Sequence, residues 1–548
     1  MAAFVRRPPV PVRIGGLASL VTILIFLSAC TELKQYRTVT VKSPQTGEIK
    51  DQICSKRSPN SSTDLCALEH RTYTYDGAEH DYYFATVELD DQGWFWDRRQ
   101  MELLLRFLYD YRDAAGKPGE FLIFAHAHGW QHNADACDNN VICLQRFLER
   151  MDVSERLFNK EAPRKVVGVF IAWRGRSIKV PKVSATSFYS RKETGNRVGI
   201  GSVTELLVRL NDLRRFKNPR RLGSQTQLVI SGHSFGGQVI FKALGQLLTE
   251  NAVSMAEKEG GKDYGYKVAS SFADLVVLVN PAFEGSAFES LQSAATSRCY
   301  PERQRPAVIV VTSVADDATK KAFPAGRSLS NLFTRNQCPD QRKAVLHTVG
   351  HLDRYKTHEL KLKGMEPGKL APKDRKEGEC GCPYLAPIED FLMKSQDKDF
   401  FEQMKKVEAE RQRSDGKIYE LGGAGAYASV ADYTETSYGL DSEGKEIVLD
   451  RSPDYAANYP YMVIYTNADF VPSHSAIYGE RFTDFLRRFY FRHLVERLNF
   501  PCQCFKNSNP ECLANDVIPC DRSWIPRLEY SCEAKPVAGP RVESSCPE

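Results

Sequence analysis

A serine between two glycines is the part of this chain that points most directly to chemistry. The pentapeptide Gly-His-Ser-Phe-Gly occupies residues 232–236, after the apolar run 228–231 and before apolar residues that recur at helical spacing. A serine on a sharp strand-to-helix turn exposes its hydroxyl as a nucleophile, and the glycines remove side chains that would clash there. We therefore expect Ser234 to be a nucleophile. The backbone N–H of Phe235, at the start of the helix, is the expected donor to an oxyanion.

A second donor is expected from a loop near residue 130. Acyl transfer needs two N–H donors for its tetrahedral oxyanion. His128, Gly129 and Trp130 directly follow the apolar run 121–125, and Trp130 is the expected donor residue. His126 and His128 are alternatively metal ligands, but no carboxylate or third histidine has matching spacing. The sequence thus predicts neither a metal nor another cofactor.

Strands and helices must alternate to hold these loops. Short apolar runs occupy 121–125, 166–173, 228–231, 275–279, 308–312 and 461–465, and apolar residues at helical spacing occupy 96–111, 142–151, 203–213, 239–248 and 482–494. Near-continuous apolar strands separated by amphipathic helices indicate an α/β fold whose mostly parallel sheet is covered by helices on both faces.

This succession resembles the α/β-hydrolase family over roughly residues 85–320 and 456–498. The resemblance rests on a strand followed by a His-Gly turn, alternating strands and helices, the serine turn, and then an Asp and a His. It implies a Ser-His-Asp triad in the chain order serine, acid, histidine. The implied base is His474, and the implied acid is Asp316 or Asp317. We prefer Asp316, because it leaves the preceding strand first.

Other histidines and acids compete for these roles. His347, His351 and His358 lie nearer the acid in sequence, and we expect them to be structural or surface residues. His233 is expected to shape the turn rather than to act as a base. Asp469 is a fallback acid, although it lies on the same loop as His474.

The N-terminus has the pattern of an export signal. Arg6, Arg7 and Arg13 precede the mostly apolar run 14–27, and Ser28-Ala29-Cys30 follows it. The stretch 27–30 resembles the lipobox of bacterial lipoproteins. That resemblance implies cleavage before Cys30, lipidation of this cysteine and anchoring in the cell envelope. The residue after Cys30 is Thr31 and not an aspartate, which by the same resemblance implies anchoring in the outer membrane.

These features divide the chain into six parts. We expect a signal peptide (1–29), a tether with a Cys54/Cys66 disulfide loop (30–70), the first part of the hydrolase core (71–320), an insertion that forms a cap or a surface excursion (321–455), the last part of the core (456–498) and a disulfide-rich tail (499–548). Removing Cys30 from the total of 15 cysteines leaves an even number for disulfides.

The net charge of the chain bears on which partners are expected. The formal net charge of +5 over 548 residues does not favour a nucleic-acid partner. The expected partners are an ester-containing small molecule or lipid, and the membrane through Cys30. Two alternatives remain: a non-catalytic envelope lipoprotein, and a redox or metal protein based on Cys380/Cys382 and Cys502/Cys504. The second uses Cys-x-Cys pairs, and an oxidising compartment favours structural disulfides for them.

Overall fold

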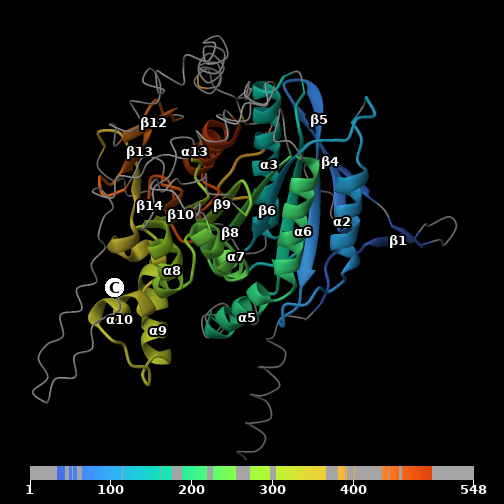
Figure 1. Cartoon of the computed structure of the whole chain (residues 1–548). Coiled ribbons are helices and arrows are strands. Elements are labelled where there is room, and N and C mark those ends of the chain that lie inside the picture. Colours follow the sequence, from blue (N-terminus) through green and yellow to red (C-terminus); the bar gives the residue numbers. More distant parts are fainter. Residues whose placement is uncertain are drawn as a thin grey trace, which may run out of the picture.

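The structure, a computed structural model, describes most of the chain between residues 34 and 495 (Figure 1). The described residues are 34–42, 49–51, 53–57, 65–113, 115–160, 162–175, 188–218, 226–254, 272–296, 304–365, 381–388, 391, 400, 435–441, 443–455 and 459–495. The expected signal peptide, Cys30 and the cysteine-rich tail lie outside them. Among the described residues, no helix is long and apolar enough to cross a membrane.

One large mixed sheet organises the described residues. In spatial order its twelve strands are β12 (Glu435–Leu440), β13 (Glu446–Arg451), β11 (His358–Leu362), β14 (Tyr461–Thr466), β10 (Val308–Ser313), β9 (Leu275–Val279), β8 (Gln227–His233), β6 (Phe121–Ala127), β7 (Lys165–Trp173), β5 (Ala78–Leu89), β4 (Leu68–Tyr75) and β3 (Cys54–Arg57). The eight consecutive strands from β11 to β5 are parallel to one another, and β13 and β4 pair antiparallel with the two ends of this series. A separate pair consists of β1 (Thr40–Lys42) and β2 (Ile49–Asp51).

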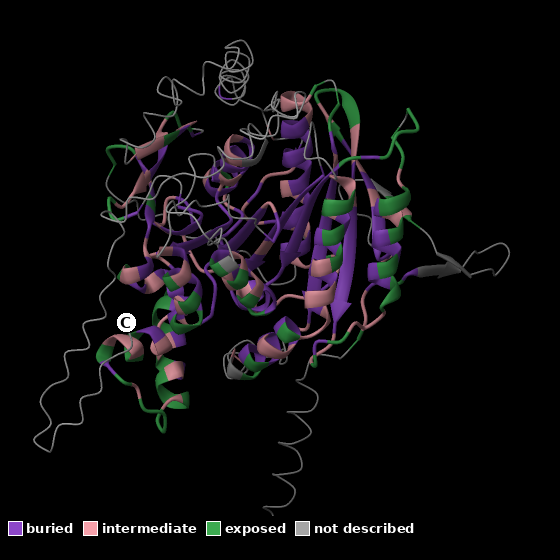
Figure 2. Cartoon of the chain, in the orientation of Figure 1, coloured by how far each residue is buried: buried purple, intermediate pink, exposed green. Residues whose placement is uncertain are grey.

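Helices cover both faces of this sheet (Figures 1 and 2). One core contains side chains of α2 (Arg99–Asp110), α6 (Ser202–Lys217), α7 (Phe235–Ser254) and α8 (Gly285–Thr296), and the other contains those of α3 (Asn139–Phe158) and α13 (Glu480–Tyr490). Every residue of β6, β9 and β10 is buried. The prediction of a mostly parallel sheet with helices on both faces is confirmed. The sequence allowed this prediction because strands buried on both faces form near-continuous apolar runs.

The segment before the last strand differs from the expected cap or surface excursion. After β10 it contains η2 (Ala318–Ala322), α9 (Phe323–Ser330), α10 (Pro339–Leu346), η3 (Val349–His351) and η4 (Asp353–Tyr355). It then supplies β11, β12 and β13, which extend the sheet beyond β14. These short strands carry too few apolar residues for the sequence to reveal them, and their pairing partners define them. The polar helix α5 (Phe188–Ile200) was also missed, and η6 (Phe491–Val495) follows α13.

Disulfides join distant parts of the described chain. Cys54 pairs with Cys66, as the sequence predicts. Cys143 of α3 pairs with Cys382, which lies 239 residues later. A disulfide role for Cys382 removes one member of the Cys380/Cys382 pair from the redox or metal alternative.

Candidate active site

Ser234 occupies a turn of unusual backbone geometry. Strand β8 ends at His233, α7 begins at Phe235, and Ser234 between them has φ 54°. This left-handed conformation is unfavourable for a residue with a side chain and persists only where surrounding structure holds it. Here the Ser234 amide donates to the Val279 carbonyl (3.1 Å), and the Ser234 carbonyl accepts from the Ala282 amide (3.0 Å). The turn is therefore fixed by the neighbouring strand β9 and the loop after it.

The glycines around this turn permit close backbone contacts. A Cβ atom on Gly236 would lie 2.0 Å from the Ala127 carbonyl oxygen, and one on Gly232 would lie 2.5 Å from the Gly236 carbonyl oxygen. A Cβ atom on Gly129 would lie 3.0 Å from the Ser234 Cβ. The loop after β6 therefore lies directly against the serine turn, as the two-donor interpretation requires.

The structure brings Ser234, His474 and Asp316 together, although they are far apart in sequence. His474 Nε2 is 2.7 Å from Ser234 Oγ. On the other side of the ring, His474 Nδ1 is 2.8 Å from Asp316 Oδ1. Ser234 and Asp316 are buried, whereas the His474 side chain is 19% exposed. One imidazole thus bridges a hydroxyl and a buried carboxylate.

The two adjacent aspartates have different surroundings. Asp316 is fully buried, and it accepts hydrogen bonds from His474 and from both the amide and the hydroxyl of Thr319. Burial alone would raise the pKa of Asp316, but His474 and Thr319 outweigh it and hold this pKa below its ordinary value. Asp317 is exposed and pairs with Lys321 (2.8 Å). Only Asp316 therefore contacts the histidine as an ionised acceptor.

His351 lies behind the acid rather than beside the serine. Its Nε2 is 2.9 Å from Thr319 Oγ1, whose hydroxyl donates to Asp316. Burial lowers the pKa of His351 to about 4, so the ring is neutral at pH 7. The Thr319 hydroxyl proton is already given to the carboxylate, so we assign the His351 proton to Nε2, where it donates to Thr319. Thr319 and His351 thus orient the acid, a role that the sequence did not reveal.

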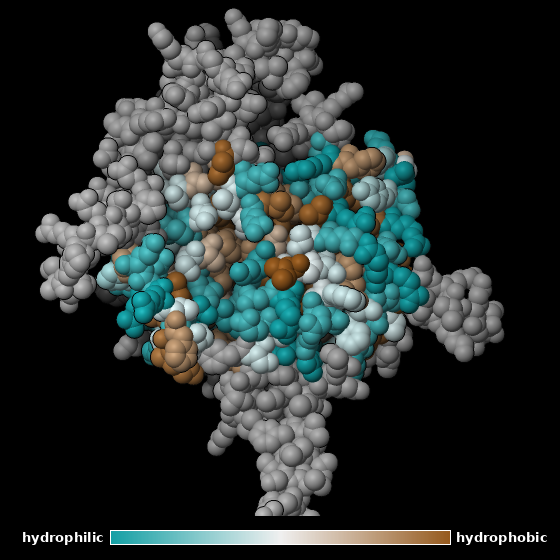
Figure 3. All heavy atoms as spheres, turned by 60° about the horizontal axis from the view of Figure 1, so that its bottom comes forward, coloured by the Kyte–Doolittle hydropathy of each residue, from teal (hydrophilic) through white to brown (hydrophobic). Residues whose placement is uncertain are grey.

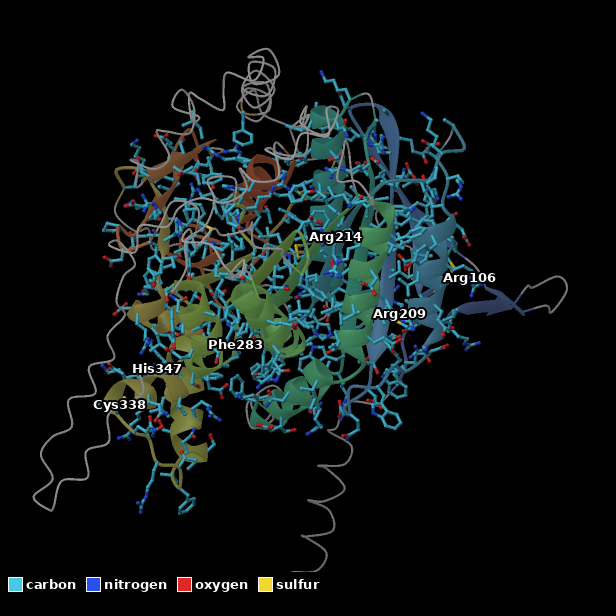
Figure 4. The ribbon with its side chains drawn as sticks, viewed as in Figure 1. Arg106, Arg209, Arg214, Phe283, Cys338 and His347 are labelled. Carbon is cyan, nitrogen blue, oxygen red and sulfur yellow. A yellow bond between two sulfur atoms is a disulfide. The ribbon has the colours of Figure 1, made fainter. Side chains whose placement is uncertain are left out.

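The other competing residues lie outside this arrangement. His358 is buried in β11, where its Nδ1 is 2.8 Å from the Thr357 hydroxyl, and burial lowers its pKa to about 3. His347 follows α10 (Figure 4). The backbone amide of Asp469 donates a hydrogen bond to Asn467 Oδ1 (2.9 Å) in the loop after β14. His233 Nε2 donates to the His474 carbonyl oxygen (2.8 Å) and so supports the loop that carries His474.

His126, near the end of β6, and His128, in the loop after it, have structural contacts within the protein. His128 Nδ1 donates to the Gly129 carbonyl (2.9 Å), and its Nε2 accepts from the Trp173 amide (3.1 Å). His126 Nδ1 is 2.9 Å from the Ser231 hydroxyl. Burial lowers the pKa of both rings, to about 4 for His128 and about 3 for His126. Both nitrogens of His128 are thus used within the protein, and in the described part of the chain no three metal-binding side chains cluster.

The two expected oxyanion donors flank the serine turn. Phe235 is the first residue of α7, whose first N–H groups have no partner within the helix. Trp130 follows Gly129, which lies against Ser234. Among the described residues, neither amide has a hydrogen-bond acceptor. Both N–H groups therefore remain available to a ligand.

Aromatic rings gather beside these donors. The Phe188 ring lies 5.6 Å from that of Trp130 and 4.8 Å from that of Phe235, between ring centroids. Phe188 comes from α5, which packs against α7. Sequence reasoning missed this residue because α5 has no strong apolar periodicity. The three rings make the surroundings of the serine turn apolar on this side.

Asn280 is a further supporting residue that the sequence did not single out. Its Nδ2 donates to the His474 carbonyl (3.1 Å), and its Oδ1 accepts from the Ser313 amide (3.0 Å). Its φ of 44° is again in the left-handed region, which asparagine tolerates better than most residues. An asparagine directly after an apolar strand was the available signal. This side chain ties the ends of β9 and β10 to the histidine loop.

No family model, curated protein or solved structure matches this chain. What the structure itself shows is a mixed α/β fold with a mostly parallel twelve-stranded sheet. At the carboxyl ends of its central strands, the His474 imidazole is placed to take a proton from the Ser234 hydroxyl while the Asp316 carboxylate contacts the opposite ring nitrogen. The function is therefore inferred from the geometry of Ser234, His474 and Asp316.

Proposed function

We propose that this protein is a serine hydrolase that cleaves carboxylic ester or thioester bonds through an acyl-enzyme intermediate. The observation that carries the proposal is the position of His474, 2.7 Å from Ser234 Oγ and 2.8 Å from Asp316 Oδ1. A nucleophile, a base and an orienting acid in hydrogen-bond contact are the geometry that recurs in serine hydrolases of unrelated folds. The unfavourable φ of Ser234 supports the same conclusion, since strained backbone clusters at catalytic sites.

In the proposed mechanism, His474 Nε2 accepts the Ser234 hydroxyl proton as Oγ attacks the carbonyl carbon. The amides of Phe235 and Trp130 donate to the oxyanion, and Asp316 holds the imidazolium through Nδ1–H. The proton then passes from His474 to the departing alcohol or thiol, which leaves the acyl group on Ser234. Water activated by His474 attacks the acyl carbonyl and releases the acid, which regenerates the serine.

The finer fold belongs to the same proposal. A serine on a positive-φ turn between β8 and α7, followed along the chain by Asp316 and then His474, is the arrangement typical of α/β-hydrolases. The parallel sheet supports this assignment, because each of the three side chains comes from a loop at the carboxyl end of a strand. We therefore propose an α/β-hydrolase fold.

Labelling with a fluorophosphonate tests the proposed activity directly. This reagent phosphonylates a serine only where a base activates it, so we expect a single adduct on the peptide that contains Ser234. Peptide mass spectrometry locates the adduct. Ser234→Ala should abolish labelling. Ser231→Ala should leave it intact, because that hydroxyl contacts His126 and not the proposed base. A folded protein that never labels would instead be a non-catalytic lipoprotein.

We also propose that the chain is a lipoprotein of the bacterial envelope, anchored through Cys30. The support is the basic, apolar and small-residue succession of residues 6–30. The disulfides Cys54–Cys66 and Cys143–Cys382 agree with an oxidising compartment. Each buried CH₂ group of an acyl chain adds about 0.8 kcal/mol of membrane affinity. The proposed partners are therefore this membrane and an ester-containing small molecule or lipid, without nucleic acid.

Mass spectrometry of the mature N-terminus tests the anchor. We expect the protein isolated from a bacterial membrane to begin at Cys30 and to carry acyl chains on its sulfur and amine. Cys30→Ala should abolish the acyl modification and lower the share of the protein found in the membrane fraction. An unmodified Cys30, or a mature chain that begins elsewhere, contradicts the proposal.

A further inference from the structure

An apolar tip projects from the last turn of α9 and the loop after it. We use this name for Leu329, Leu332 and Phe333, whose exposed fractions are 68%, 66% and 99%. In Figure 2 the loop is exposed, and Figure 3, which brings the lower end of Figure 1 forward, shows apolar side chains gathered within a mainly hydrophilic surface. Large apolar side chains that gather on a surface mark a site of contact with a protein or a membrane.

Hydrogen bonds within the tip define its shape. The Asn331 amide donates to the Arg327 carbonyl (3.0 Å), and the Thr334 amide donates to the Asn331 carbonyl (3.1 Å). The Asn331 side-chain amide also donates to the Arg327 carbonyl (2.7 Å). Polar backbone groups that are paired within the turn lower the cost of moving it out of water. The tip is thus suited to an apolar environment as well as to a protein surface.

The charge around the tip favours a membrane over a protein surface. The segment 318–346 carries six lysines and arginines and one aspartate, which gives it a net charge of +5. Three of these cations are paired: Lys321 with Asp317, Arg327 with Glu284 and Lys343 with Asp340. The other three, Lys320, Arg335 and Arg342, are exposed and have no acidic partner among the described residues. Apolar side chains surrounded by cations match a bilayer surface, where acyl chains receive the former and anionic headgroups attract the latter.

We propose that the apolar tip inserts into the surface of a membrane rich in anionic phospholipid. The tip follows Asp316 through η2 and α9. In Figure 1, α9 lies at the end of the molecule toward which the carboxyl ends of the parallel strands point. Docking through the tip therefore turns the end that carries Ser234, His474 and Asp316 toward the lipid. The contact is additional to an N-terminal lipid and does not depend on hydrolase activity.

A tryptophan at the tip provides a local test in the full chain. Phe333→Trp is measured by fluorescence with vesicles of phosphatidylcholine that contain about one-third phosphatidylglycerol. We expect the emission, after subtraction of the wild-type spectrum, to shift to shorter wavelength and to be quenched by brominated acyl chains. Phe216→Trp is the matched control, because Phe216 is 67% exposed on α6. It should show neither change.

Binding measurements separate the possible occupants of the tip. In the Cys30→Ala background, Phe333→Ser should weaken vesicle binding about tenfold, and Phe216→Ser should leave it unchanged. Added salt and vesicles without phosphatidylglycerol should weaken the binding as well. The proposal is overturned if the Phe333→Trp emission does not change when vesicles are added, or if the Phe216→Trp emission shifts equally. A shift without vesicles that grows with protein concentration would mean that a second copy of the chain covers the tip.

Discussion

Replacing Asp316 with asparagine is expected to lower kcat for ester hydrolysis about 10⁴-fold. The amide group of asparagine would offer an N–H to His474 Nδ1, where the carboxylate now accepts one at 2.8 Å. The ring would then carry its proton on Nε2, which faces Ser234, and could no longer accept the hydroxyl proton. Steady-state kinetics with p-nitrophenyl esters of increasing chain length measure the effect.

The neighbouring aspartate is the matched control. Asp317→Asn removes an exposed ion pair with Lys321, and such pairs contribute little, so kcat should stay within about twofold of the wild type. Both variants should show the same far-ultraviolet circular dichroism as the wild type. If Asp317→Asn loses activity by orders of magnitude while Asp316→Asn keeps it, the acid has been assigned to the wrong residue.

Removing the imidazole of His474 is expected to lower kcat by about 10⁶-fold, the scale found when a triad loses its base. Without this ring no side chain contacts Ser234 Oγ in the described part of the chain, so the hydroxyl keeps its proton. Triad members act as a unit. The Ser234→Ala/His474→Ala double variant should therefore be no less active than either single variant. Single-turnover measurements of acyl-enzyme formation locate the loss in the first chemical step.

His347→Ala is the control for this substitution. His347 is half-buried beyond α10 and contacts neither the serine nor the acid, so its loss should change kcat by less than about threefold. Full turnover by His474→Ala would remove it as the base. A double variant much worse than both single variants would mean that Ser234 and His474 act independently.

Much of the fold follows from local physical chemistry. Strands β6, β9 and β10 are buried on both faces, and such strands are mostly apolar, so the sequence shows them as near-continuous apolar runs. The serine turn was recognised from its two glycines, of which Gly232 is required by a contact within the turn and Gly236 by a contact with the distant Ala127. The small strands β11 to β13 were not predictable in the same way. Their pairing with β14 and with one another defines them, rather than their own composition.

The candidate site was likewise predictable only in part. Ser234, Phe235 and Trp130 were predicted from residue types and their places after strands, and His474 from the resemblance to α/β-hydrolases. The choice between Asp316 and Asp317 rested only on which residue leaves the strand first, because two adjacent acids have the same local chemistry. The path of the chain after β10 decides it, since it buries one carboxylate against Thr319 and His474 and leaves the other exposed.

The sequence by itself thus determined most of the central strands and helices and the residues that carry reactive groups, because burial and turn geometry constrain residue types over short stretches. The tertiary structure alone decided which of those groups meet. It placed His351 behind the acid, Asn280 beneath the histidine loop and Phe188 beside the serine turn. These contacts join residues far apart along the chain, and no local pattern encodes their pairing.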